Sequence, residues 1–188
     1  MSASTEPTAP AVTAVTALDV QTARARILAA LCAVPQTETV PLRQALGAVL
    51  ADIVNSPLDV PAHDNAAMDG FAVRAADLRT GGNTCLPVAG VALAGKPLAG
   101  AVPPGHAVRI MTGAVMPDGL DTVVMQEVCS LQGEMVTIAP GQRAGQNRRL
   151  RAEELRAGQP ALPAGRLLRP ADIGLLASLG IESAMVRR

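Results

Sequence analysis

The sequence predicts an α+β protein, with helices near its beginning and a β-rich central part. Residues 19–33 and 41–53 repeat apolar side chains at intervals of three or four, which is the helical period. After Ser56 the pattern changes to short apolar runs separated by glycine and proline, which is typical of strands joined by tight turns. With 17 glycines and 15 prolines among 188 residues, we expect many short elements.

The beginning of the chain divides into a tail and two predicted helices. Residues 1–16 are rich in Ser, Thr, Pro and Ala, and we expect a disordered tail there. Asp19 is placed to cap a first helix that runs to about Ala33. A second helix is predicted over 41–53, because Pro41 suits a first helical turn and the apolar residues that follow form one stripe.

Five apolar runs predict the strands of the central part. They are FAVR, CLPVAGVAL, HAVRIM, DTVVMQEV and EMVTIA, between residues 71 and 139. The sequences PPG at 103–105 and PDG at 117–119 predict turns, because proline presets φ and glycine accepts positive φ. Near the end, residues 170–181 predict a short helix that stops at Gly180, and ESAMVRR predicts a last strand.

These elements suggest a discontinuous organisation. We expect an α/β lobe made of residues 17–56 and 146–188, interrupted by an inserted β-rich lobe of residues 57–145.

Composition excludes several classes of function. Lys plus Arg and Asp plus Glu are 16 each, so no basic field attracts nucleic acid, and one phenylalanine is the only aromatic residue available for stacking on bases. No segment is predicted to be a signal peptide or to cross a membrane. Cys32, Cys85 and Cys129 form no CxxC pair, so we expect each to be a buried, reduced side chain in a cytoplasmic protein.

One stretch resembles a phosphate-binding loop but lacks two features that such a loop requires. Residues 90–97, GVALAGKP, match G-x-x-x-x-G-K, but Pro97 stands where a magnesium-binding hydroxyl is required. The flanking residues indicate strand and turn, whereas a phosphate loop opens a helix. We therefore do not predict an ATP site.

An arginine-rich segment has two interpretations. The cluster also contains Glu153 and Glu154, and its arginines are Arg143, Arg148, Arg149, Arg151 and Arg156. Arginine forks suit phosphate and carboxylate anions. A solvated surface loop whose charges pair with one another explains the segment equally simply, and the segment alone favours that second interpretation.

Two loops carry side chains suited to chemistry. Thr112 and Gly113 follow the run 108-VRIM-111, where a hydroxyl and backbone N–H groups can hold an oxyanion or close their own turn. Asp64 and Asp69 flank 65-NAAM-68, where carboxylates serve metal binding or proton transfer, as in a metal-dependent hydrolase, or form ordinary Asx turns. Spacing alone leaves both alternatives open in each loop.

The longer motifs have a familiar order. PLDVPAHDNAAMDGFAVR, VRIMTGAVMPDGLDTVVMQE, GQNRR and LASLGI occur in succession, and the chain from residue 18 to residue 188 resembles the N-terminal part of the molybdopterin molybdenumtransferase family, called MoeA or, in animals, the gephyrin E domain. The resemblance implies bifurcated, coiled sheets in an elongated homodimer. It also implies molybdenum cofactor biosynthesis, in which molybdate is inserted into adenylated molybdopterin with Mg²⁺ and AMP is released.

The resemblance also assigns roles to residues. Asp69 and Thr112 become catalytic residues of the cleft, Glu154 becomes a metal ligand, and Phe71 anchors the loop. The implied substrate-binding residues are Asp64, Asn65, Met68, Gly70, Gly113, Arg148 and Arg149.

This sequence departs from the family pattern in three places. Ala66 stands where serine is common, and Ala152 and Glu154 stand where the family often has the glycine and aspartate of a GED motif. A longer acid on a less flexible backbone is expected to displace a metal-facing carboxylate.

The sequence also lacks the TGDE motif and the glycine-rich loop of the family's C-terminal, pterin-binding domain. We therefore expect half of a composite site, completed by that domain in trans or by a molybdopterin adenylyltransferase partner. The alternative is a non-catalytic dimerisation or scaffold protein.

Overall fold

The computed structural model describes residues 17–32 and 34–187, so the predicted tail of residues 1–16 lies outside the described part. The chain folds into two compact units. The first contains α1, and the second covers Thr37–Arg187. Within the described part, no helix has both the length and the apolar character needed to cross a membrane.

The first helix, α1 (Val20–Ala30), begins where the sequence predicts. The Asp19 carboxylate accepts hydrogen bonds from the backbone N–H groups of Gln21 and Thr22, each at 3.0 Å, and therefore caps the helix. None of the α1 residues is buried.

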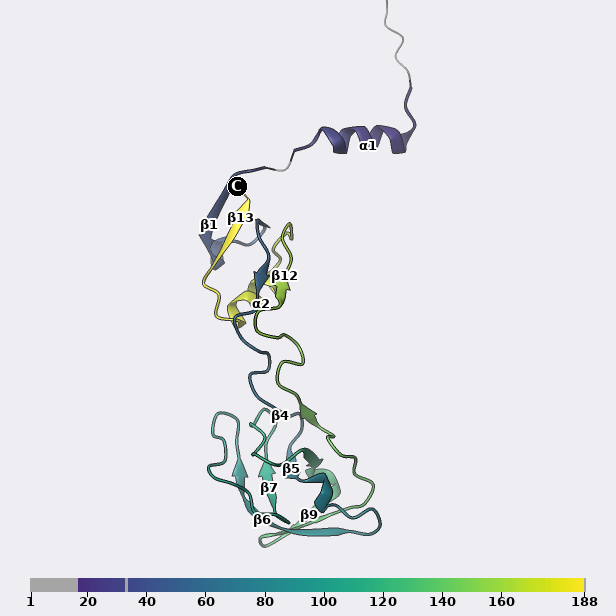
Figure 1. The fold of residues 1–188 in the computed structure, drawn as a ribbon, viewed down its shortest axis with the longest axis vertical. Coiled ribbons are helices and arrows are strands. Elements are labelled where there is room, and N and C mark those ends of the chain that lie inside the picture. Colours follow the sequence, from purple (N-terminus) through teal and green to yellow (C-terminus); the bar gives the residue numbers. More distant parts are fainter. Residues whose placement is uncertain (1–16, 33, 188) are drawn as a thin grey trace, which may run out of the picture. The chain divides into compact units, whose positions relative to one another are not determined.

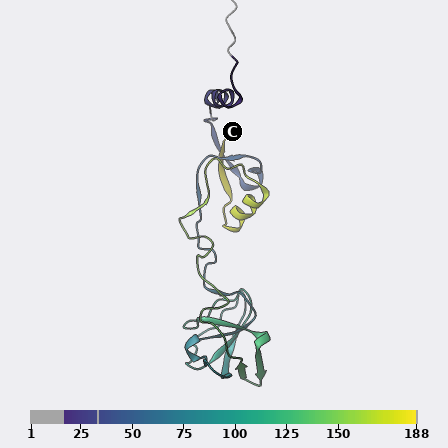
Figure 2. The same cartoon turned by 90° about the vertical axis from the view of Figure 1, so that its right-hand side faces the viewer.

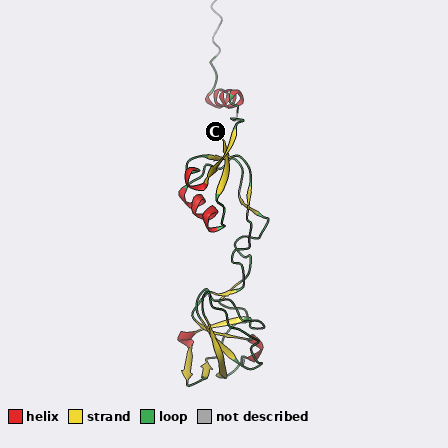
Figure 3. Ribbon diagram, turned by 90° about the vertical axis from the view of Figure 1, so that its left-hand side faces the viewer, coloured by secondary structure: helices red, strands yellow, loops and turns green. Residues whose placement is uncertain are grey.

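The second unit contains a three-stranded antiparallel sheet of order β1-β13-β2 (Figure 1). Its strands are β1 (Thr37–Pro41), β13 (Ser183–Arg187) and β2 (Val49–Leu50). Figure 3 shows the helix α2 (Pro170–Ser178) beside this sheet. Leu176 of α2 is fully buried in one core with Leu50 and Val186. The last strand predicted from ESAMVRR is therefore confirmed, and so is the preceding helix, which ends before Gly180 at φ +75°.

The helix predicted over 41–53 is wrong. Leu42–Gln44 form only the single 3-10 turn η1, and Gly47 at φ +79° interrupts the chain. Leu50 instead lies opposite Val186 in β13, and its backbone N–H and carbonyl bond Arg166 and Gly165 at 2.9 and 2.8 Å. The pairing of residues far apart in sequence overrode the local period.

The larger sheet has six strands in the order β8-β5-β7-β6-β10-β9 and curls on itself (Figure 2). Its strands are β8 (Thr122–Met125), β5 (Gly70–Val73), β7 (Ala107–Ile110), β6 (Thr84–Ala92), β10 (Met135–Ile138) and β9 (Cys129–Gln132). All neighbouring strands are antiparallel except β6 and β7. The five apolar runs are thus confirmed as strands, and the α+β class is confirmed.

Short elements complete the fold. Two small ladders pair β3 (Val54–Asn55) with β12 (Pro160–Leu162) and β4 (Asn65–Ala66) with β11 (Arg148–Arg149). Two further 3-10 turns are η2 (Ala75–Asp77) and η3 (Gln126–Val128). The division at residues 57 and 146 stays a prediction.

The turn and cysteine predictions had different outcomes. Gly105 and Gly119 have φ of +70° and +78°, as the PPG and PDG turns require. Burial of all three cysteines is wrong, because Cys32 and Cys85 are exposed. Cys129 is half-buried, and burial, with a smaller effect of the Glu127 charge, raises its pKa to about 11.

Candidate functional site

Three segments that the sequence separates lie against one another around β4. Ala66 donates its backbone N–H to the Ala114 carbonyl at 3.0 Å, and Gly113 donates to the Ala66 carbonyl at 2.8 Å. On the other side, Ala67 donates to the Asn147 carbonyl at 2.9 Å. These backbone bonds bring the Asp64–Asp69 loop, the Thr112 loop and the arginine-rich segment together.

Asp69 and Thr112, the two residues predicted to be catalytic, bond directly. The Asp69 Oδ1 accepts the Thr112 backbone N–H at 2.7 Å and the Thr112 hydroxyl at 2.6 Å. The hydroxyl bond first, and then the backbone bond, hold the pKa of Asp69 below its usual value. Both bonds end on Oδ1, and no hydrogen bond to Oδ2 is formed within the described part. Asp69 is therefore an ionised carboxylate with one oxygen available to a ligand.

The chain around Asp69 is held rigidly because of Gly70 and Phe71. Gly70 begins β5 between Ile110 and Met125, and a Cβ at this position would overlap the carbonyl oxygen of Val124. Only glycine allows β8 to approach so closely. Phe71 is 4% exposed, so its ring anchors the loop in the core of the curled sheet.

Asp64 faces the arginine-rich segment. Its Oδ1 accepts the Arg151 backbone N–H at 2.7 Å, and its Oδ2 lies 3.7 Å from Nη1 of Arg148. No hydrogen bond or ion pair within the described part joins Asp64 to Asp69. The two aspartates therefore do not form a pair.

The remaining predicted residues of this loop differ in exposure. Asn65 and Arg148 carry the two buried side-chain atoms without a partner in the described part, Oδ1 and Nε respectively. Such atoms are rare in folded proteins, so Asn65 Oδ1 can accept a hydrogen bond from a ligand or water, and the Arg148 Nε–H can donate one. Met68 is 41% exposed. Gly113 has φ +80°, which favours glycine after Thr112.

One arginine of the arginine-rich segment, Arg149, is paired with carboxylates of the same segment, whereas Arg148 and Arg151 pair with Asp64 and Asp59 outside it. Arg149 Nε donates to Glu153 Oε1 at 3.1 Å, and its Nη2 also bonds Glu154. The backbone N–H of Leu150 and then Arg149 lower the pKa of Glu153. Pairing of charges within the segment is what the simpler interpretation of the sequence expected.

Glu154 was predicted to be a metal ligand. Within the described part, no group of three or more His, Cys, Asp or Glu side chains could hold a metal ion. Glu154 is bonded to Arg149, and no bond joins it to Asp69 or Thr112. These residues do not fit a complete Mg²⁺ site.

Ala152, which replaces the family glycine, has a left-handed backbone with φ +60°. Its N–H nevertheless donates to the Pro61 carbonyl at 3.0 Å. An alanine is strained here, because its Cβ crowds the backbone, and glycine is not. The comparison of this sequence with the family motif therefore identified a position whose backbone has the left-handed conformation that favours glycine.

Sequence reasoning missed two residues next to the site. Asp59 accepts the Ala157 backbone N–H at 2.8 Å and Arg151 Nε at 2.6 Å, and these two bonds, in that order, lower its pKa. Arg109 on β7 lies close enough to Asp69 for its charge to lower that pKa as well. Arg109 belongs to the predicted strand run 108-VRIM-111, but no local pattern shows which distant residue it approaches.

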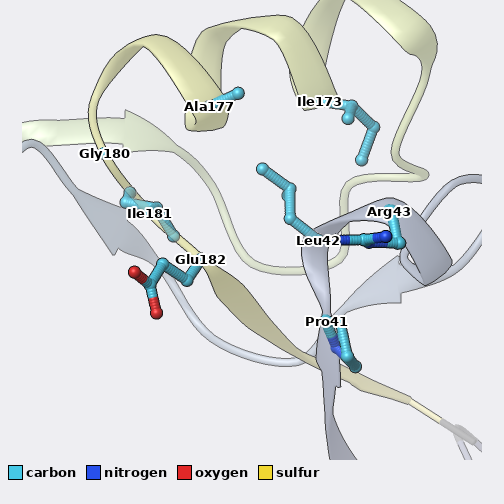
Figure 4. A pocket seen from close by; sticks show the side chains of 8 residues that line it. All are labelled: Pro41, Leu42, Arg43, Ile173, Ala177, Gly180, Ile181 and Glu182. Carbon is cyan, nitrogen blue, oxygen red and sulfur yellow. The ribbon is translucent and has the colours of Figure 1, made fainter.

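Two hollows differ in their relation to these residues. One of about 280 Å³ is lined by His63, Asp64, Asp118 and Arg151, beside the Asp64 loop. Another of about 720 Å³ lies between η1 and α2, where Leu42 faces Ile173 and Ala177 (Figure 4). None of the predicted site residues lines the larger hollow, so its size does not make it the candidate site.

Comparisons with known proteins agree with this geometry. The model of the family described as "MoeA N-terminal region (domain I and II)" matches residues 18–180. The molybdopterin molybdenumtransferase of Haemophilus influenzae is 41% identical over 172 residues, which are 91% of this chain and 42% of the relative. The enzyme of the same name from Nostoc sp. is 44% identical over 157 residues, 81% of this chain and 36% of the relative.

A solved structure shares the fold. The crystal structure of the molybdopterin biosynthesis moeA protein from Pyrococcus horikoshii OT3 has a TM-score of 0.77 and 35% identity, and the alignment covers 82% of this chain and 42% of that one. The chain thus spans less than half the length of these relatives.

Proposed function

Because this chain belongs to the MoeA N-terminal region family, we propose that it takes part in molybdenum cofactor biosynthesis. We propose further that it supplies one part of the site where a molybdopterin molybdenumtransferase inserts molybdate into adenylated molybdopterin and releases AMP. The observation that carries the proposal is the Asp69–Thr112 pair, with bonds of 2.6 and 2.7 Å. These residues match the MDG and MTGA motifs of the family.

The chemistry of this pair suits a polar heterocycle. Thr112 fixes one oxygen of the Asp69 carboxylate and keeps the group ionised. The second oxygen can accept hydrogen bonds from N–H groups of a pterin or from water. Asp69 therefore orients the substrate, and removal of its charge should weaken that orientation.

The phosphate end of the substrate needs cations. Arg148 and Arg149 follow each other on β11, directly opposite Ala66 and Asn65. Arg149 is paired with Glu153 and Glu154, so an incoming phosphate must compete with these carboxylates. Since the described carboxylates do not fit a Mg²⁺ site, we derive no step through the metal.

Partners and location follow from the same proposal. This chain covers 42% of the Haemophilus influenzae relative, and we propose that the rest of the site is supplied by the C-terminal region that this relative has, or by a molybdopterin adenylyltransferase. A cytoplasmic location suits these partners.

The test is AMP release from adenylated molybdopterin with molybdate and magnesium, using the 188-residue chain alone and with the remaining part of the Haemophilus influenzae relative added. We expect AMP release that depends on molybdate in the complemented sample and its loss in Asp69→Asn. Asp52→Asn, an exposed aspartate outside the site, is the matched control. If the complemented chain releases no AMP, or if Asp69→Asn is fully active, the proposed function is wrong.

A second candidate, dimerisation or scaffolding, is favoured by α1. The helix has 11 residues and buries none of them, while Ile27 and Leu31 are 62% and 66% exposed. Isolated helices of this length are marginal in water, so a partner surface should cover the apolar stripe. In a homodimer, Ile27→Ser with Leu31→Ser should shift the mass measured by light scattering from dimer to monomer. An unchanged mass would remove α1 from the interface.

A further inference from the structure

Arg109 lies on the same face of the curled sheet as the chain's only aromatic residue. It is directly opposite Phe71 on β5 and Val91 on β6. Side chains that are directly opposite one another on neighbouring strands point to the same face. Arg109 therefore extends over a face that also carries apolar side chains.

This face is hollowed. A pocket of about 350 Å³ is lined by the apolar side chains of Phe71, Val88, Val91 and Leu131, with Arg109 and Glu134 as its charged residues. Ligand pockets commonly combine an apolar lining with a few polar groups that fix orientation.

The Arg109 side chain is half-buried but unpaired. The half-buried arginines Arg74 and Arg148 lie near carboxylates of Asp77 and Asp64, at 3.8 and 3.7 Å, and Arg149 bonds two glutamates. Arg109 makes no side-chain hydrogen bond or ion pair within residues 17–32 and 34–187. A guanidinium has five N–H donors, so this group is available to an anion.

Arg109 is also close to the Asp69–Thr112 pair. It precedes Thr112 by three residues on the strand that pairs with β5. Its charge helps to lower the pKa of Asp69, yet no ion pair forms between the two side chains in the described part. The guanidinium therefore lines the pocket, and its charge acts on the carboxylate of the candidate catalytic pair.

We propose that Arg109 is an anion-binding residue of the Asp69–Thr112 site and binds a tetrahedral oxyanion. When this oxyanion is a phosphate group, the rest of the molecule that contains it lies over Phe71 and Val91. A phosphate group of the substrate and free molybdate are both tetrahedral oxyanions. Only the naming of these two anions as candidate ligands rests on the proposed function. Glu134 in the same pocket disfavours a second negative charge, so we expect one oxyanion to bind.

The experiment follows anion binding by NMR in the ¹⁵N-labelled 188-residue chain at constant ionic strength. Sodium phosphate and sodium molybdate are added separately, and the Arg109 Nε–H and Thr112 backbone N–H signals are recorded. We expect saturable shifts at both positions. Arg109→Gln should weaken binding, read at Thr112, about tenfold or more, because a charge-assisted hydrogen bond is lost.

Three variants sharpen the result. Arg109→Lys keeps the charge but not the planar fork, and should bind with intermediate affinity. Glu134→Gln should bind more tightly, because it removes a repelling charge. Arg79→Gln, at an exposed arginine outside the pocket, should bind like the original chain.

The outcomes separate this inference from the proposed function. Tighter binding of phosphate identifies a substrate phosphate as the occupant, and tighter binding of molybdate identifies the free anion. Absence of saturable shifts with both anions, or equal shifts in Arg109→Gln, would overturn the inference even if AMP release succeeds. Anion binding that needs Arg109 would support it even if AMP release fails.

Discussion

Asp69 and Glu154 are carboxylates that the family resemblance assigns to the same cleft, but the structure holds them in different ways. Asp69 accepts two bonds from Thr112 and stands at the start of a strand whose glycine fits closely against β8. Glu154 bonds the flexible side chain of Arg149 in an exposed segment that contains the strained Ala152. The first site is preorganised by backbone pairing, whereas the second can rearrange when an anion competes for Arg149.

The largest expected effect tests the rigid side of this comparison. Gly70→Ala places a methyl group on the Val124 carbonyl oxygen, so β5 and β8 cannot both keep their positions. We expect a loss of about 3 kcal/mol in the free energy of unfolding, typical of severe overpacking. Urea denaturation followed by circular dichroism measures this loss. Gly81→Ala, with nothing within 4 Å of the added Cβ and no positive φ, is the control and should be nearly neutral.

A smaller effect concerns the charge of Asp69. Thr112→Val removes the hydroxyl bond, the largest cause of the lowered pKa, so the pKa should rise toward 3.8. Since the folded pKa is below the unfolded one, ionised Asp69 stabilises the fold fully above the unfolded value, and this stabilisation is lost as pH falls through the folded value. The stability difference between the two proteins should therefore shrink in acid. Carboxyl NMR titration measures the pKa, and an unchanged value would contradict the assigned cause.

The smallest expected effect tests the strained backbone at Ala152. Ala152→Gly relieves the left-handed backbone at φ +60° but adds conformational freedom to the unfolded chain. We expect a net gain of about 0.5 kcal/mol in the free energy of unfolding, because the relief exceeds the entropic cost. The midpoint of urea denaturation measures it. Ala157→Gly, where alanine has no positive φ, should lose stability, and a loss in Ala152→Gly would show that its backbone is not strained.

Local signals in the sequence predicted five strands of the larger sheet, the last strand and the last helix. The runs from FAVR to EMVTIA became strands because short apolar runs and the turn residues between them specify strands locally. The helix predicted over 41–53 failed because Leu50 finds its partner in β13, more than a hundred residues away. The period over residues 19–33 was a correct helix signal for α1, although none of the α1 residues is buried.

The candidate site could also be predicted only in part from the sequence. The resemblance named Asp69 and Thr112, and the structure adds the bond between them, which a separation of 43 residues hides. Arg149 and Glu154 were named as a substrate ligand and a metal ligand, yet they bond each other. The sequence placed Arg109 only within a predicted strand, because the register that puts it opposite Phe71 is a tertiary feature.

The sequence by itself determined the class of the fold, five strands of the larger sheet, the last strand, the capped first helix and the family to which the motifs belong. These features depend on periodicity, turn chemistry and motif order, which act over a few neighbouring residues. The tertiary structure alone decided that Asp69 bonds Thr112, that a Cβ at Gly70 has no room beside Val124, and that Arg109 makes no side-chain hydrogen bond or ion pair within the described residues. Those facts depend on strand register between distant segments, which no local pattern encodes.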